Sequence, residues 1–182
     1  MTLSFTKLFA AAILIVALTA ASAAQKTSFP GAKSKARSPD GRYVIRNDDD
    51  SLSLIDSESG KQTRFYDYRR HVDVLWSPRS NAFVINDHEG SDSTKPLLFP
   101  LPWRDARIDL WEKLIPFLKS HGEAHFALEN HHVYFTVEKW LNGQQMLCKL
   151  SGYGEVDDLF TRYYVYDVRS GFRHVRRRSS RK

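Results

Sequence analysis

The sequence predicts a mainly β protein: an antiparallel meander of propeller-like hairpins, open or incomplete rather than closed, with one amphipathic α-helix. Three observations lead to this prediction. Aromatic residues make up 13% of the chain, and many alternate with polar residues, as in strands that bury one face. A Ser-Pro turn followed by an apolar run occurs twice, at 38–45 and 77–85. Between 103 and 120 the apolar residues instead recur every three or four positions, which is the period of a helix.

Residues 1–24 are predicted to form a cleaved signal peptide. Lys7 supplies a positive charge, Leu8–Ala20 is apolar, and Ala21-Ser22-Ala23 has the small residues that a signal peptidase reads. The apolar stretch is shorter than the ~20 residues that span a bilayer, which disfavours the alternative of a membrane anchor. We therefore expect an exported protein, periplasmic or secreted, that does not span a membrane after cleavage. Residues 25–37 are small, polar and basic, and are expected to form a flexible lead-in.

A single β-rich domain is predicted over 38–172. Its strands are expected where apolar or alternating runs lie between clusters of turn residues. Polar stretches at 47–50, 57–61 and 86–95 are interpreted as turns and loops, although the acidic residues of 47–50 and 87–92 would also suit calcium. The expected strands cover 43–45, 51–56, 63–68, 72–76, 83–85, 133–137, 145–150 and 162–168.

One amphipathic helix is predicted near 103–120. Pro102 is tolerated at a helix start, Pro116 is expected to kink or shorten the last turn, and Gly122 is expected to end the helix. We expect this helix to cover one side of the sheet, and a partner-binding helix is the alternative. Its apolar face consists of Trp103, Ala106, Leu110, Trp111, Leu114, Phe117 and Leu118.

Two short patterns are repeated along the domain. Ser38-Pro39-Asp40-Gly41 returns as Ser77-Pro78-Arg79-Ser80, with the two prolines 39 residues apart. Leu54–Gly60 and Val165–Gly171 both read apolar-apolar-Asp-x-x-Ser-Gly. These patterns resemble the repeats of TolB-type and WD-type (WD40-like) β-propellers. The resemblance implies β units of ~40 residues, and the chain has room for at most about four of them, so a closed propeller is not expected. It implies no single activity, because propellers host both enzymes and scaffolds.

His121, Glu123, His125 and His132 are the candidate metal ligands. The first three alternate, so on a strand they would share one face, and imidazole and carboxylate groups would suit zinc. Their spacing matches no metalloprotease motif. We therefore favour solvated histidines and expect no cofactor, with zinc as the alternative.

Cys148 is the only cysteine of the chain, so no internal disulfide is possible. Its neighbours Met146 and Leu147 are apolar, which favours a buried thiol over a reactive one. Shortly after this run, Gly152 and Gly154 are expected to mark a turn.

Residues 173–182 are predicted to form a basic tail. The chain has a formal net charge of +6, and much of that charge lies near the C-terminus. The tail is either simply solvated or an electrostatic docking surface for an anionic partner. Because no recognition helix accompanies the tail and an exported protein rarely meets nucleic acid, no nucleic acid is expected. The basic residues of this surface are Arg173, Arg176, Arg177, Arg178, Arg181 and Lys182.

The predicted function is therefore that of an exported, soluble, β-rich binding module. Its partner is expected to be a protein or an anionic component of the cell envelope. No catalytic or cofactor-binding residue stands out in the sequence. The alternative is an exported metal-dependent hydrolase that uses the region His121–His132.

Overall fold

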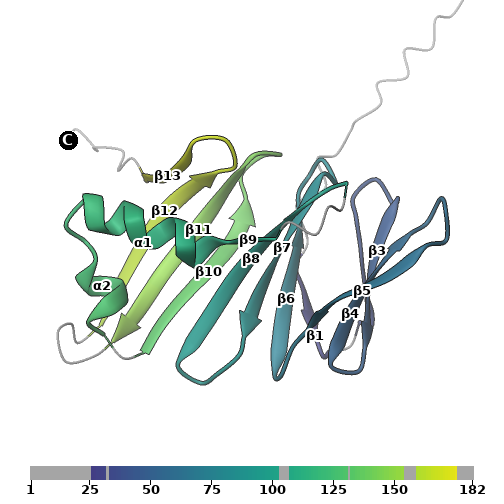
Figure 1. Ribbon diagram of the computed structural model, residues 1–182, viewed down its shortest axis with the longest axis horizontal. Helices are drawn as coiled ribbons and strands as arrows, with labels where there is room; N and C mark the ends of the chain where they lie inside the picture. The colour runs from purple at the N-terminus through teal and green to yellow at the C-terminus, as the bar shows by residue number, and fades with distance from the viewer. Residues whose placement is uncertain (1–25, 32, 103–106, 131, 154–158, 176–182) are drawn as a thin grey trace, which may run out of the picture.

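The computed structural model describes residues 26–31, 33–102, 107–130, 132–153 and 159–175. It confirms the predicted fold class: the described strands form two open sheets and close into neither a barrel nor a propeller. The longer sheet crosses the molecule, with the helices at one end and the smaller sheet at the other (Figure 1). The longer sheet contains β1 (Lys26–Phe29), β6 (His71–Trp76), β7 (Ala82–His88), β8 (Ser93–Pro100), β9 (Ile108–Asp109), β10 (His132–Trp140), β11 (Gln145–Tyr153), β12 (Phe160–Asp167) and β13 (Gly171–His174). The smaller sheet contains β2 (Lys35–Arg37), β3 (Tyr43–Asp48), β4 (Ser51–Asp56) and β5 (Gln62–Asp67).

The longer sheet has the order β1-β6-β7-β8-β10-β11-β12-β13, with β9 added to β8. Its pairs are antiparallel except for β8 and β10, which run parallel. A parallel pair needs a crossover connection, and the segment with β9, α1 (Leu110–Ser120) and α2 (His125–Leu128) supplies it. The parallel register covers only Ser93 with Val133 and Thr94 with Tyr134. The predicted antiparallel meander is therefore interrupted at this short parallel junction, and also at β1, which pairs with β6 while β2–β5 form the smaller sheet.

Two apolar cores lie on the sheets. One lies between α1 and strands of the longer sheet, so the helix covers one side of that sheet, as expected (Figure 1). The other joins the smaller sheet to β6, β7 and β8. The first core includes Leu110, Leu114, Leu118, Phe135, Cys148 and Tyr164. The second includes Ile45, Leu52, Val74, Trp76, Phe83 and Phe99.

Helix α1 begins later than the prediction near 103–120. Residues 103–106 lie outside the described residues, and Ile108–Asp109 form the short strand β9 against β8. The helix starts at Leu110 because Asp109 caps it: the Trp111 backbone N–H donates to Asp109 Oδ1 at 2.9 Å.

The other end of α1 agrees with the predicted stop. Pro116 lies inside the helix, which nevertheless continues to Ser120 and keeps Leu118 fully buried. Gly122 follows in a left-handed conformation, with φ of 71°. None of the helices that the structure describes is long and apolar enough to cross a membrane.

The expected flexible lead-in instead contains two edge strands. Lys26–Phe29 pairs with β6, and Lys35–Arg37 pairs with β3. Phe29 is fully buried in the core between the sheets, which anchors the segment despite its polar composition.

The repeated Ser-Pro pattern specifies a repeated turn. The backbone N–H of Ser38 and that of Ser77 each donate to the carbonyl five residues further on, at 2.9 Å in both copies. The residue three positions after each serine has a positive φ, 75° at Gly41 and 56° at Ser80. The two turns also touch, because the Asp40 backbone N–H donates to Ser80 Oγ at 3.0 Å.

The second repeated pattern also has one geometry. Asp56 Oδ1 and Asp167 Oδ1 each accept hydrogen bonds from the backbone N–H groups two and three residues further on. Gly60 and Gly171 then take positive φ values of 69° and 83°, which a residue without a Cβ adopts readily. Each aspartate thus ends a strand with the same side-chain turn.

Candidate functional site

A polar pocket of about 330 Å³ lies between β6–β8 and β10–β11. Strand register explains its position, since Asp73 opposes Asn86 and His71 opposes His88 across the β6–β7 pair. Opposed residues, and residues two apart on a strand, share one face. The pocket is lined by Lys26, Asp73, Asn86, His88, Thr94, Tyr134, Thr136, Val137, Glu138, Lys149 and Ser151.

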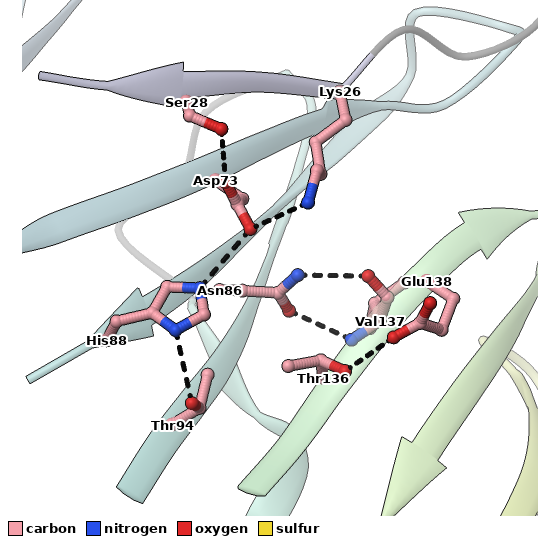
Figure 2. Close-up of polar contacts among 9 residues, drawn as sticks. All are labelled: Lys26, Ser28, Asp73, Asn86, His88, Thr94, Thr136, Val137 and Glu138. Atoms are coloured by element: carbon pink, nitrogen blue, oxygen red, sulfur yellow. Dashed lines mark hydrogen bonds and ion pairs between the residues drawn. The ribbon is translucent and has the colours of Figure 1, made fainter. Parts of the chain in front are cut away.

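A chain of polar contacts runs along one wall of this pocket (Figure 2). Asp73 Oδ2 lies 3.2 Å from His88 Nε2 and 3.2 Å from Lys26 Nζ. The Ser28 hydroxyl donates to Asp73 Oδ1 at 2.5 Å. On the other side of the imidazole, His88 Nδ1 lies 3.3 Å from Thr94 Oγ1. The result is a carboxylate–imidazole–hydroxyl chain built by β6, β7 and β8.

The Asp73 carboxylate is held in its ionised form. Its burial opposes ionisation, but hydrogen bonds from His88 and Ser28 and the charge of Lys26 outweigh that effect and lower the pKa of Asp73 to about 2. Beside it, the His71 and His88 rings stack with centroids 3.9 Å apart. Burial and the neighbouring His88 lower the pKa of His71, so proximity to a carboxylate does not make His71 a cation at neutral pH.

Replacing Asp73 by Asn should change the pH dependence of stability. The pKa of the aspartate is near 3.8 when unfolded and about 2 when folded, so ionisation stabilises the fold above pH 4. That contribution, about 2 kcal/mol, disappears as the pH falls through 2. In urea unfolding, the difference between the native protein and Asp73→Asn should therefore be constant above pH 5 and shrink between pH 4 and pH 2. The exposed Asp67→Asn is the control, and an equal pH dependence in both variants would contradict this assignment.

Asn86, in β7, links the β6–β8 part of the longer sheet to its β10–β13 part beneath the pocket. Its Nδ2 donates to the Val137 carbonyl and its Oδ1 accepts from the Val137 N–H, both at 2.9 Å (Figure 2). The backbones of β8 and β10 pair only over a short register. Further along β10, the Asn86 amide makes the two hydrogen bonds to Val137 that a neighbouring strand would otherwise make. The pocket wall on β10 is therefore fixed relative to β7.

The polar chain can orient a ligand group or move a proton. An imidazole between a carboxylate and a hydroxyl is the arrangement in which a base activates a nucleophile. The Thr94 hydroxyl, however, belongs to a residue that is only 2% exposed. Its backbone carbonyl accepts from Trp111 Nε1 at 2.9 Å, so α1 fixes this residue in place. This setting favours a structural support for the His88 ring over an attacking hydroxyl.

The sequence does not reveal this site, because the polar composition of 86–95 predicts a loop. Asn86 and His88 instead belong to β7, and Thr94 belongs to β8. Asp87, between the first two, points to the opposite face and accepts a hydrogen bond from the buried Tyr66 hydroxyl. A strand that is buried on both faces and carries polar residues has no alternation to reveal it. Both acidic stretches contain a predicted turn, at 49–50 between β3 and β4 and at 89–92 between β7 and β8, and both turns are shorter than expected.

The candidate metal ligands do not form one site. His125 begins the short helix α2, and its ring lies 4.0 Å from that of Phe126, centroid to centroid, so His121, Glu123 and His125 do not share one face of a strand. His132 lies in β10 and stacks on Tyr153. Within the described residues, no group of three or more His, Cys, Asp or Glu side chains is arranged to hold a metal ion.

His121 and Glu123 are brought together through β13. The His121 ring lies 4.9 Å from that of His174, centroid to centroid, and Glu123 Oε1 lies 4.0 Å from His174 Nδ1. Glu123 Oε2 also accepts a hydrogen bond from the Tyr164 hydroxyl at 2.9 Å. These contacts tie the end of α1 to the sheet edge.

The remaining predictions concern Cys148 and the basic tail. Cys148 is fully buried, as predicted, and burial raises the pKa of its thiol, which makes it a poor nucleophile. Arg173 is exposed on β13. The other predicted tail residues, Arg176, Arg177, Arg178, Arg181 and Lys182, lie outside the described residues, as does the predicted signal peptide.

No protein-family model matches this chain, and a search of curated proteins found no significant match. The propeller-like resemblance therefore remains an expectation from the repeated turns, and a fold alone implies no activity.

Proposed function

We propose that this protein is an exported, non-enzymatic binding module whose polar pocket receives a small polar group of its ligand. The observation that supports this most strongly is the chain from Asp73 through His88 to Thr94, which is oriented by hydrogen bonds before any ligand arrives. Ligand sites are typically concave and place a few polar groups in fixed orientations. A pocket of about 330 Å³ suits a group of the size of one sugar ring or one side chain.

The charges of the lining narrow the ligand class. Lys26 and Lys149 balance Asp73 and Glu138, so the pocket has no strong preference for either sign of charge. Hydroxyl groups, an amide and an imidazole provide both donors and acceptors. We infer a neutral, hydroxyl-rich group such as a sugar unit of a cell-envelope component.

Export and the basic tail complete the proposal. Export is supported by the charge, apolar stretch and small residues of 1–24. Cleavage would leave Ala24 or Gln25 as the first residue, which mass spectrometry of the protein from its source would test. The tail over 173–182 would add salt-sensitive attraction to a protein or to an anionic envelope component.

A titration of ¹⁵N-labelled protein with neutral sugars tests the pocket. A ligand should shift the amide signals of His88, Thr94 and Tyr134 in a saturable way. His88→Ala should weaken that binding at least about tenfold, because two oriented polar groups lose their partner. His125→Ala, which changes a histidine outside the pocket, should leave it unchanged. If no sugar shifts these signals, or if both variants weaken binding equally, the proposal is wrong.

Hydrolysis is the second candidate function, and the Thr94–His88–Asp73 chain is the observation that favours it. His88 would take the proton of the threonine hydroxyl as its oxygen attacks the acyl carbon, and would give that proton to the alcohol or amine that departs, with Asp73 stabilising the imidazolium in between. Water would then displace the acyl group from Thr94 and regenerate the hydroxyl. Small esters and dipeptides in the same titration distinguish the two functions. Product signals that disappear in Thr94→Val would favour the hydrolase, whereas saturable shifts without products favour the binding module.

A further inference from the structure

A second pocket, of about 320 Å³, lies where edge strands of the two sheets meet. β1 ends the order of the longer sheet and β2 ends that of the smaller one. Three of the side chains that line the pocket are basic and none is acidic. The lining consists of Thr27, Lys33, Lys35, Ala36, Arg37, Ser38, Pro39 and Trp76.

Backbone donors lie beside these positive charges. The Ser34 carbonyl accepts a hydrogen bond from the backbone N–H of Asn47, in β3, at 2.9 Å. The Ser38 backbone N–H donates to the carbonyl of Tyr43, also in β3, at 2.9 Å. Because backbone groups alternate in direction along an antiparallel strand, both the N–H and the carbonyl groups of Lys35 and Arg37 point away from β3, at the open edge. Within the described parts of the chain, these two N–H groups have no hydrogen-bond partner.

The basic side chains are also free to accept a ligand. Lys33, Lys35 and Arg37 are exposed, and none forms an ion pair with another described residue. The guanidinium of Arg37 makes only a long contact, 3.4 Å, with the Gly41 carbonyl. Three cations close together repel one another, and an anion between them would relieve that repulsion.

The floor of the pocket is rigid. Trp76 is buried, and its Nε1 donates to the Ala36 carbonyl at 3.2 Å, which holds β2 against the longer sheet. Thr27 is only 8% exposed, and its hydroxyl has no partner among the described residues. β1 thus serves both pockets: Lys26 lines the polar pocket, and Thr27, on the opposite face, lines this one.

We propose that this pocket binds a phosphate group, carried by a soluble phosphate or by a lipid headgroup. A tetrahedral oxyanion can accept from several converging donors, and here these are two backbone N–H groups, the Thr27 hydroxyl and three cationic side chains. A carboxylate has only two oxygens and would leave most of these donors unused. This site is separate from the polar pocket, so its failure would leave the proposed function untouched.

Two probes test the proposal on the full chain. The first is inorganic phosphate, followed through the amide signals of Lys35 and Arg37. The second is cosedimentation with vesicles of phosphatidylglycerol and phosphatidylcholine in equal parts, compared with phosphatidylcholine alone. Lys35→Ala/Arg37→Ala should weaken phosphate binding at least about tenfold. Lys113→Ala/Lys119→Ala removes the same charge from the exposed side of α1 and should change binding less than about twofold.

The outcomes separate the two sources of phosphate and the simpler electrostatic explanation. Saturable amide shifts without cosedimentation support a soluble phosphate ligand, and variant-sensitive cosedimentation supports a headgroup. Thr27→Val keeps every charge, so weaker binding in this variant supports a built site. Equal losses in the two double variants would show general charge attraction, the basic tail included, and would overturn the proposal. Absence of both shifts and cosedimentation would overturn it as well.

Discussion

Replacing Asn86 by Ala should destabilise the protein by about 2–5 kcal/mol, the largest loss that we expect from a single polar side chain. The substitution removes both hydrogen bonds that the amide makes to Val137. The N–H and carbonyl of Val137 then remain in a buried region without a partner, and each such group costs about 1–3 kcal/mol. Urea unfolding of the purified protein measures the loss.

Asn142→Ala is a matched control for this prediction. Asn142 Oδ1 also bonds to the backbone, accepting from the N–H groups of Gln144 and Gln145 at 2.8 and 2.9 Å, but in an exposed turn. Water can replace those bonds, so this variant should lose less than about 1 kcal/mol. If both variants lost the same free energy of unfolding, water would also be replacing the Asn86 amide. The contact between β7 and β10 would then not depend on the Asn86 side chain.

Local features of the fold could be predicted because they depend on neighbouring residues. The turns at Ser38 and Ser77 share one hydrogen bond and one positive-φ position, and both are visible in the sequence as a Ser-Pro pattern. The helix was recognisable from its apolar face, of which Leu110, Leu114 and Leu118 are fully buried. The sequence does not show that the helix begins just after Asp109, because this cap depends on one side-chain hydrogen bond.

The candidate sites could not be predicted because they depend on which strands become neighbours. Asp73 and His88 meet only through the β6–β7 register, and Asn86 meets Val137 only because β10 docks parallel to β8. No local pattern specifies a parallel pair whose connection runs through α1 and α2. Residues 25–37 show the same limitation, since a single buried Phe29 outweighs the polar composition that indicated a lead-in.

Gly152 offers a second strong test, and it corrects a further expectation. It lies inside β11 between β10 and β12, not in a turn, and Gly154 lies outside the described residues. A Cβ at Gly152 would lie 2.4 Å from the His132 carbonyl oxygen and 3.0 Å from the Phe160 ring. Backbone on one side and a buried ring on the other leave no easy relaxation, so Gly152→Ala should cost about 3 kcal/mol. Thermal unfolding should show a fall in Tm of about 6–12 °C.

Gly143→Ala separates this explanation from a general intolerance of β11 and its hairpin to added volume. A Cβ at Gly143 would lie just as close, 2.4 Å, to Arg79 Cδ. Arg79, however, is an exposed and flexible side chain, which can swing into solvent at little cost. We therefore expect a change of less than about 1 kcal/mol in this variant. Similar losses at both positions would show that crowding distance alone decides the cost. A large loss only at Gly152 would show that the rigid backbone of β10, which also forms a wall of the polar pocket, cannot move away from β11.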